Sequence, residues 1–270
     1  MGLINLNKTL ISLETPIIMG ILNITEDSFF DGGCYTSETA VLKRVEQMQE
    51  EGATLIDLGV VSTKPNAVEI SENQEFESMH KYLRLILSHF PEAHISVDTF
   101  RAMVADMAIK EGAALINDVS GGADPMMFDV VGKHRIPYVL THNNRSYPLK
   151  TKDLIPNMLS FFGNNIENLV SKGVMDIIVD PGFGFGKTLE QNYYLIKHLE
   201  IFSILNLPIL VGISRKSMIQ CVLETTVAES LVGTIALNTI SLCHKTSILR
   251  VHDVKQCFET IQIFNSSRLL

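Results

Sequence analysis

The chain has 270 residues, of which 46% are hydrophobic and 19% are charged, a composition typical of a folded globular protein. The 22 Lys and Arg against 30 Asp and Glu give a net charge of −8, which argues against a broad surface for nucleic acid or an anionic membrane. Four cysteines without a CxxC spacing favour free thiols in a reducing compartment.

The first 23 residues are interrupted by Asn, Lys, Glu and Pro too often to form the apolar core of a signal peptide. Leu6 stands where an N-myristoylation signal needs Ser or Thr. Apolar runs in the sequence are shorter than the roughly 18 residues of a membrane span. The sequence therefore predicts a soluble, cytoplasmic protein that has neither nucleic acid nor a membrane among its partners.

Short runs rich in β-branched residues predict eight strands. They cover residues 16–22, 54–59, 94–98, 114–118, 136–141, 176–180, 208–213 and 246–251. Most of these runs are continuously apolar, as expected for strands buried on both faces of a parallel sheet.

Amphipathic stretches between the strands predict helices, of which the clearest cover residues 39–51, 102–110, 190–205 and 227–244. Thr99 is the expected N-cap of the second helix, and Gly52 and Gly112 are expected to end helices just before strands. Alternating strands and helices over this length predict a TIM (β/α)8 barrel, which typically takes about 250 residues. A doubly wound open sheet is the alternative. Because no linker divides the chain, we expect one domain over residues 1–270, with the motifs between about 16 and 262.

Each predicted strand ends in polar or charged residues. In chain order they are Asn23; Asp57; Asp98; Asn117 with Asp118; His142; Asp180; Ser214 to Lys216; and Arg250 with His252. Parallel strands of a barrel bring their carboxyl ends to one rim, where active sites of this fold lie. The pattern therefore predicts an active site at that rim.

The motif RVHD places Arg250 and His252 two residues apart, so that both side chains are expected on the same side of the strand. A guanidinium beside an imidazole suits phosphate oxygens. The alternative is an Arg paired with a neighbouring Asp.

The glycine-rich stretch 180–188 resembles a P-loop but has three residues where that motif needs four. We expect instead a tight turn after Asp180, with Phe183 and Phe185 exposed for stacking on a flat ligand. In the motif GISRKS, the neighbouring Arg215 and Lys216 are not expected to face the same pocket, which predicts a structural role for one of them. The histidines do not form a metal set, and only His142 and His252 are expected at the rim.

Six segments, taken together and in order, resemble the dihydropteroate synthase family. They are residues 19–33, 95–99, 116–121, 179–188, 211–217 and 250–254. The resemblance implies a TIM barrel that joins 6-hydroxymethyl-7,8-dihydropterin pyrophosphate to 4-aminobenzoate and releases pyrophosphate. It further implies Mg²⁺ as the cofactor, a homodimer formed through the last helices, and a target of sulfonamides.

The resemblance also implies site residues, which are carried over motif by motif. The pterin residues are Asp98, Asn117, Asp180, Phe185, Gly212 and Lys216, and the diphosphate residues are Asn23, Arg250 and His252, with Asn23 on the metal. The aminobenzoate residues are Phe29, Thr63, Lys64, Pro65, Lys216 and Ser217, and the catalytic set is Asn23, Asp27, Lys216 and Arg250. An ionisation-like mechanism is implied, in which C–O cleavage leaves a pterin cation that the arylamine attacks.

The chain departs from the family pattern in the two loops after the first and second strands, residues 25–35 and 60–67. The departures there are Glu26, Val61, Lys64 and Asn66. Residues 141–148 lack the family's Met that packs on the pterin. Because the pterin and diphosphate residues are intact, the departures bear on aminobenzoate handling and loop closure. Lys64 keeps a charge but lacks the planar fork of Arg.

Two alternatives stay open at this point. The first is a methyltetrahydrofolate-dependent methyltransferase, which the cations of SRKS and RVHD disfavour because a methyl donor carries no diphosphate. The second is a non-catalytic pterin-binding protein that has kept the pocket and lost the lid.

Overall fold

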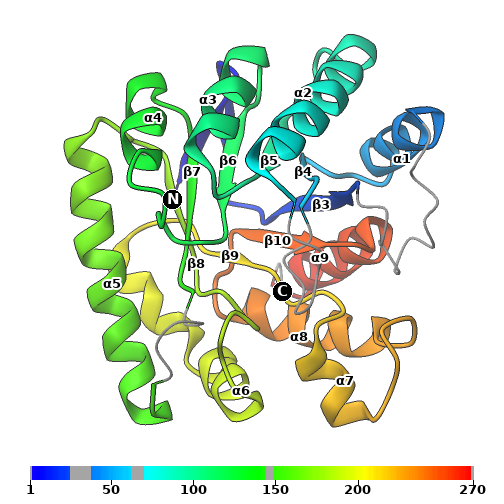
Figure 1. Cartoon of the computed structure of the whole chain (residues 1–270). Coiled ribbons are helices and arrows are strands. Elements are labelled where there is room, and N and C mark those ends of the chain that lie inside the picture. Colours follow the sequence, from blue (N-terminus) through cyan, green and yellow to red (C-terminus); the bar gives the residue numbers. More distant parts are fainter. Residues whose placement is uncertain (1, 25–37, 62–69, 144–148, 269–270) are drawn as a thin grey trace.

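The computed structural model describes residues 2–24, 38–61, 70–143 and 149–268. Eight strands form one parallel sheet in the order β8-β7-β6-β5-β4-β3-β10-β9, and a parallel bridge between Val179 and Ile209 joins its two ends. The sheet is therefore closed, and helices surround it (Figure 1). This is the predicted TIM barrel, and the doubly wound open sheet is wrong.

All eight predicted strands are confirmed. They are β3 (Ile17–Asn23), β4 (Leu55–Gly59), β5 (Ile95–Asp98), β6 (Leu115–Asp118), β7 (Tyr138–Thr141), β8 (Ile177–Asp180), β9 (Leu210–Val211) and β10 (Ile248–Val251).

The helices are α1 (Glu38–Glu50), α2 (Glu72–His89), α3 (Ala102–Glu111), α4 (Met127–His134), α5 (Thr151–Ser171), α6 (Leu189–Lys197), α7 (Ser217–Leu223), α8 (Leu231–Cys243) and α9 (Val254–Arg268), with a 3-10 helix η1 (Leu199–Leu205). The predicted helix 190–205 is thus two elements, because the chain leaves helical geometry at His198. None of the helices described is both long and apolar enough to cross a membrane.

The start of α3 differs from the prediction. Its N-cap is Arg101, not Thr99, and the N–H of Ala102 donates to the Asp124 carboxylate over 2.8 Å. The Thr99 hydroxyl donates instead to the buried Glu75 over 2.5 Å. At the other end of α3, Gly112 caps the helix in the left-handed region as expected.

An antiparallel hairpin precedes the barrel and was not predicted, since its strands are only four residues each, β1 (Leu3–Leu6) and β2 (Thr9–Ser12). The Asn7 side chain donates to the carbonyl of Gly112 over 3.0 Å, just before β6. The Asn5 N–H donates to Asp176 over 3.4 Å, just before β8. The hairpin therefore covers the end of the barrel at which the strands begin.

The interior of the barrel has two layers. The lower layer is apolar and packs with Ile4 and Leu6 of the hairpin; it contains Ile17, Met19, Leu55, Leu115, Val139, Ile178, Leu210 and Ile248. Because side chains two residues apart on a strand share a face, the next inward residues form an upper layer. It contains Ile21, Asp57, Asn117, Thr141, Asp180, Gly212 and Arg250, with Ser96 and Asp98 from β5. The upper layer lies where the strands end and, apart from Ile21 and Gly212, is polar.

Candidate active site

Arg250 lies at the centre of the upper layer. Its Nε donates to Asp57 over 2.6 Å and its Nη2 donates to Asp98 over 2.8 Å. Asp57 also accepts hydrogen bonds from Ser96 Oγ at 2.6 Å and from Asn117 Nδ2 at 3.0 Å. One network therefore connects β4, β5, β6 and β10.

The pairing of Arg250 is the alternative that the sequence left open. Its guanidinium bridges two carboxylates, whose charges raise the pKa of Arg250 against the effect of burial. Burial raises the pKa of Asp98 to about 7, with Arg250 opposing that rise and the nearby Asp57 adding to it. A diphosphate at this point would have to share Arg250 with these carboxylates.

Asp57 has no role in the motif-based assignment, although it belongs to the strand-end series. It is fully buried and accepts from three side chains, so it organises the layer. Only its strand-end position marks it in the sequence.

Asp180 and Lys216 lie close to this network. Burial raises the pKa of Asp180, whereas the charges of Lys216, Lys187 and Arg250 lower it. Asp180 accepts from the N–H of Gly182 over 2.7 Å. Since Lys216 and Arg250 both act on Asp180, the predicted pterin and diphosphate groups share one electrostatic environment.

Lys216 is positioned by the glycine-rich loop. Its Nζ donates to the carbonyl of Phe183 and lies 4.8 Å from the centroid of the Phe185 ring. Phe185 is half-buried, but Phe183 is fully buried in the main core, so the prediction that both rings are exposed is wrong for Phe183. An apolar ring at that point gains more from packing against the core than from contact with water.

Lys187 belongs to the same loop and stabilises it. Its Nζ donates to the carbonyls of Gly182 and His142 at 2.8 and 3.0 Å, and burial lowers its pKa to about 7. Gly182 has a φ of +69°, and a Cβ there would lie 2.1 Å from the carbonyl oxygen of His142. The sequence indicated only a failed P-loop here and missed the role of Lys187.

The neighbouring cation, Arg215, turns away from the site. Its Nε and Nη2 donate to the Asp253 carboxylate, each over 2.7 Å, and its Nη1 donates to the carbonyls of Val227 and Ala228. The prediction that one of the two neighbouring cations is structural is therefore confirmed.

His252 and Asn23 complete the described rim. His252 Nδ1 lies 3.0 Å from Ser214 Oγ, so the imidazole is held by the segment that follows β9. Asn23 ends β3, and a Cβ on Gly59 would lie 3.1 Å from Asn23 Oδ1 and 3.6 Å from Asp98 Cβ. The lack of a side chain at Gly59 leaves room between this amide and Asp98.

An amide oxygen suits Mg²⁺, which prefers oxygen ligands and commonly takes only one or two from the protein, the rest coming from water and substrate phosphates. The described residues contain no group of three or more His, Cys, Asp and Glu that could hold a metal by itself. The donor set therefore fits a cation that shares its ligands with a phosphate, and the part of the rim that the structure describes does not by itself form a closed metal site.

Two members of the strand-end series face the helices rather than the interior. Asp118 accepts from Tyr138 Oη over 2.6 Å, and the ring of Tyr138 packs edge-on against Phe128 of α4. His142 packs against Phe161 of α5, and burial lowers its pKa to about 4. His142 is therefore not part of the interior, contrary to its expected place at the rim.

Asn117 Oδ1 and Thr141 Oγ1, both in the upper layer, are buried and have no hydrogen-bond partner among the described residues. Buried polar atoms in proteins are nearly always paired, so such atoms indicate a ligand or an ordered water.

Ser217, predicted for aminobenzoate, is exposed at the start of α7. Five other predicted residues, Asp27, Phe29, Thr63, Lys64 and Pro65, lie outside the described residues, as do Glu26 and Asn66.

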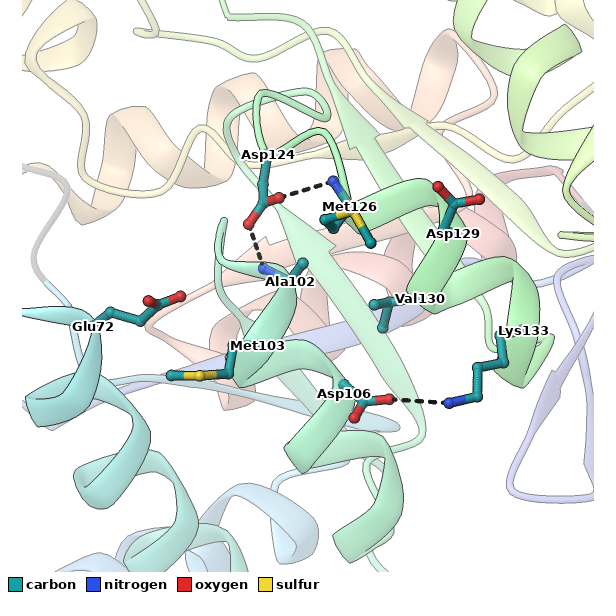
Figure 2. A pocket seen from close by; sticks show the side chains of 9 residues that line it. All are labelled: Glu72, Ala102, Met103, Asp106, Asp124, Met126, Asp129, Val130 and Lys133. Atoms are coloured by element: carbon teal, nitrogen blue, oxygen red, sulfur yellow. Dashed lines mark hydrogen bonds and ion pairs between the residues drawn. The ribbon is translucent and has the colours of Figure 1, made fainter.

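A cavity of about 500 Å³ lies elsewhere, among α2, α3 and α4 (Figure 2). Both carboxylate oxygens of Asp124 accept from backbone N–H groups, those of Ala102 and Met126, and Asp106 is paired with Lys133 at 3.9 Å. Asp106 and Asp124 are thus engaged within the fold, in contrast to the unpaired polar atoms of the upper layer.

Comparisons with known proteins agree with this geometry. The pterin-binding enzyme family matches residues 19–252. Dihydropteroate synthase of Bacillus subtilis is 42% identical over 90% of this chain and 85% of its own length, and that of Escherichia coli K12 is 36% identical over 96% and 94%.

Solved structures are similar as well. Yersinia pestis dihydropteroate synthase, in complex with a sulfonamide drug, has a TM-score of 0.94 at 35% identity over all of both chains. The Thermus thermophilus dihydropteroate synthase in complex with 4-aminobenzoate has a TM-score of 0.88 at 30% identity, covering 98% of this chain and 99% of that one.

Proposed function

The chain belongs to the pterin-binding enzymes and, within them, to the dihydropteroate synthases, and from this premise we propose how its own residues carry out the reaction. The enzyme is a transferase that joins 6-hydroxymethyl-7,8-dihydropterin pyrophosphate to 4-aminobenzoate and releases pyrophosphate. The observation that carries the proposal is the polar upper layer of the closed barrel, in which Arg250 joins Asp57 and Asp98, and in which the charges of Arg250 and of the neighbouring Lys216 act on Asp180. The whole chain acts as one domain.

The pterin ring binds against the upper layer. The amino-pyrimidinone edge of a pterin presents adjacent N–H donors, which the Asp180 carboxylate accepts, and a carbonyl, to which Lys216 donates. Asn117 supplies the unpaired amide oxygen, and Asp98 is a second buried acceptor. Phe185 lies beside Lys216 and packs on the ring, and Gly212 leaves space next to Arg250.

The diphosphate lies toward the mouth of the rim, near Asn23, Arg250 and His252. Negative charge develops on the departing pyrophosphate, so cations at this point stabilise the transition state more than the bound substrate. Arg250 would turn part of its fork from Asp98 to a phosphate oxygen when the pterin occupies that carboxylate. Asn23 is the protein ligand proposed for Mg²⁺, which when bound would neutralise diphosphate oxygens.

The reaction is a substitution with early cleavage. The C–O bond to the diphosphate breaks and its electron pair leaves with pyrophosphate, so that a delocalised pterin cation forms. The aniline nitrogen of 4-aminobenzoate then forms the C–N bond and loses a proton. Phe29, Thr63, Lys64 and Pro65 are proposed to bind the aminobenzoate together with Lys216 and Ser217, and Asp27 is proposed as a catalytic residue.

The relatives named above are dihydropteroate synthases, which favours this reaction over the methyltransferase alternative. A pyrophosphate-release assay with purified protein, Mg²⁺, pterin pyrophosphate and 4-aminobenzoate tests it. Turnover that depends on both substrates supports the proposal. Pterin binding without pyrophosphate release would instead support the non-catalytic alternative.

A homodimer is part of the proposal. Helices α7, α8 and α9 lie together on one side of the barrel (Figure 1) and expose large apolar side chains, with Val232 and Ile263 more than 70% exposed. Exposed apolar patches of this kind mark protein–protein contacts. A cytoplasmic location is also proposed, and the three described cysteines, which are free, support it.

A further inference from the structure

Thr141 is the one upper-layer residue with an unpaired buried atom that the proposed function does not use. Its side chain is fully buried, and Oγ1 has no hydrogen-bond partner among the described residues. A hydroxyl without a partner in a buried site loses its hydration and gains nothing in return. Such an atom is retained at a functional site more readily than in an ordinary core.

The position of Thr141 points to the pterin. It ends β7, two residues after Val139, which belongs to the apolar lower layer, so both side chains face the interior. In the register of β7 and β8, Thr141 is the partner of Asp180. The Thr141 side chain therefore stands beside the carboxylate proposed to hold the pterin's N–H donors.

Thr141 is also held in place by its surroundings. Its Cγ2 lies 3.1 Å from where a Cβ on Gly182 would stand, so the methyl group rests against that glycine. Lys187 ties the Gly182 carbonyl to that of His142, the residue after Thr141. The hydroxyl is therefore presented from a fixed backbone, as a binding group requires.

We propose that the Thr141 hydroxyl forms a hydrogen bond with a heteroatom of the pterin ring, next to the edge that Asp180 holds. The inference rests on the proposed function. A hydroxyl can donate to a ring nitrogen or accept from an N–H, and a pterin offers both along its edge. Thr141 is thus a specificity-determining residue that distinguishes this heterocycle from a purely apolar ring of similar shape.

The test compares two isosteric substitutions of buried threonines, each removing one hydroxyl. Thr141→Val removes the unpaired hydroxyl, and Thr246→Val removes a hydroxyl that donates to the Ser241 carbonyl over 2.8 Å, away from the site. Calorimetry with 6-hydroxymethyl-7,8-dihydropterin, which lacks the diphosphate, measures affinity, and thermal unfolding without pterin measures stability.

We expect Thr141→Val to weaken pterin binding about tenfold, the effect of one lost hydrogen bond in a buried site. Its unfolding temperature should equal or exceed that of the wild type, because an unpaired polar atom has been removed. Thr246→Val should show the reverse, with lower stability and unchanged binding. Thr141→Ser, which keeps the hydroxyl, should bind within about threefold of the wild type.

Wild-type pterin affinity in Thr141→Val would overturn the inference and leave the proposed function standing. It would mean that in the wild type a water, and not the pterin, pairs with the Thr141 hydroxyl. A loss of binding in Thr141→Ser as large as in Thr141→Val would also overturn it, because the hydroxyl would not be the cause. Failure of the wild type itself to bind the pterin would overturn the proposed function first.

Discussion

The two layers inside the barrel lie on the same strands and the same face, yet they differ in every physical respect. The lower layer, with Leu115 and Ile178, is apolar, packed against the N-terminal hairpin and closed to water. The upper layer, with Asn117 and Asp180 two residues further on, holds carboxylates whose pKa values are raised and polar atoms without partners. The lower layer stabilises the fold, whereas the upper layer lowers the stability of the fold and provides a binding surface.

This difference shows how a barrel separates stability from function. Burying carboxylates such as Asp98 and Asp180 costs free energy, and each raised pKa reports that cost. The apolar layer beneath makes the cost tolerable because its packing does not depend on them. Substitutions in the two layers should therefore have opposite signatures, and four experiments test that expectation.

Arg250 should give the largest effect, because it serves both roles. Arg250→Ala leaves Asp57 and Asp98 buried without a cation, which should lower the free energy of unfolding by about 3–5 kcal/mol. Turnover of pterin pyrophosphate should fall far more than binding of the pterin without diphosphate. Urea unfolding, steady-state kinetics and calorimetry measure the three quantities.

Arg215→Ala is the matched control for Arg250, since Arg215 is also part-buried and pairs with Asp253 outside the site. It should lower stability without changing the ratio of turnover to pterin binding. Equal losses of turnover and pterin binding in Arg250→Ala would show that Arg250 acts on structure alone.

Leu115→Ala tests the lower layer. The substitution creates a cavity beneath the site and should cost about 2–5 kcal/mol of unfolding free energy. The kcat/KM of the molecules that remain folded should stay within about threefold of the wild type. A hundredfold fall in kcat/KM at temperatures where the variant is fully folded would mean that the layers are not separable.

Asp180→Asn tests the upper layer. An amide accepts with one oxygen only, so the pterin should bind about 10–100-fold more weakly, as expected for lost hydrogen bonds to a charged group. Stability should be unchanged or higher, since the buried charge is gone. A less stable variant with normal affinity for the pterin would show that Asp180 stabilises the fold and does not bind the pterin.

Asp98→Asn tests the pH dependence of the upper layer. Burial raises the pKa of Asp98 from 3.8 to about 7, so between these values the folded chain holds a proton that the unfolded chain has released. The free energy of unfolding of the wild type therefore falls as pH rises from about 4 to about 7, because ionising Asp98 costs more in the folded chain than in the unfolded chain.

The variant lacks that loss, so its stability relative to the wild type should grow across the same window by up to about 1.4 kcal/mol per pH unit. Other carboxyls with raised pKa values, such as Glu75 and Asp118, affect the pH dependence of stability in both proteins, so their effect largely cancels in the comparison. Urea titrations at several pH values measure the difference, and a flat difference would contradict the account.

The sequence predicted most of the fold because barrel strands carry a strong local signal. Apolar runs that end in polar residues identified all eight strands and the rim. The N-terminal hairpin was missed because two four-residue strands carry little periodicity, and their stability comes from contacts with residues such as Gly112, far away in the chain.

The sequence could predict which residues belong to the site, but not which of them pair with one another. Asp180 and Lys216 came from motifs and lie together, whereas the bridging of Arg250 to Asp57 and Asp98 depends on barrel closure across 193 and 152 residues. The outward turn of His142 and the burial of Phe183 follow from packing against α5 and the core, which position at a strand end or in a loop does not reveal.

A crystal structure with 6-hydroxymethyl-7,8-dihydropterin bound tests most directly whether the upper layer is the pterin site. We expect the ring in the barrel interior, with its N–H donors on Asp180 and with Asn117 and Lys216 in hydrogen-bonding contact. A ring bound in the cavity among α2, α3 and α4, or anywhere away from the upper layer, would contradict it.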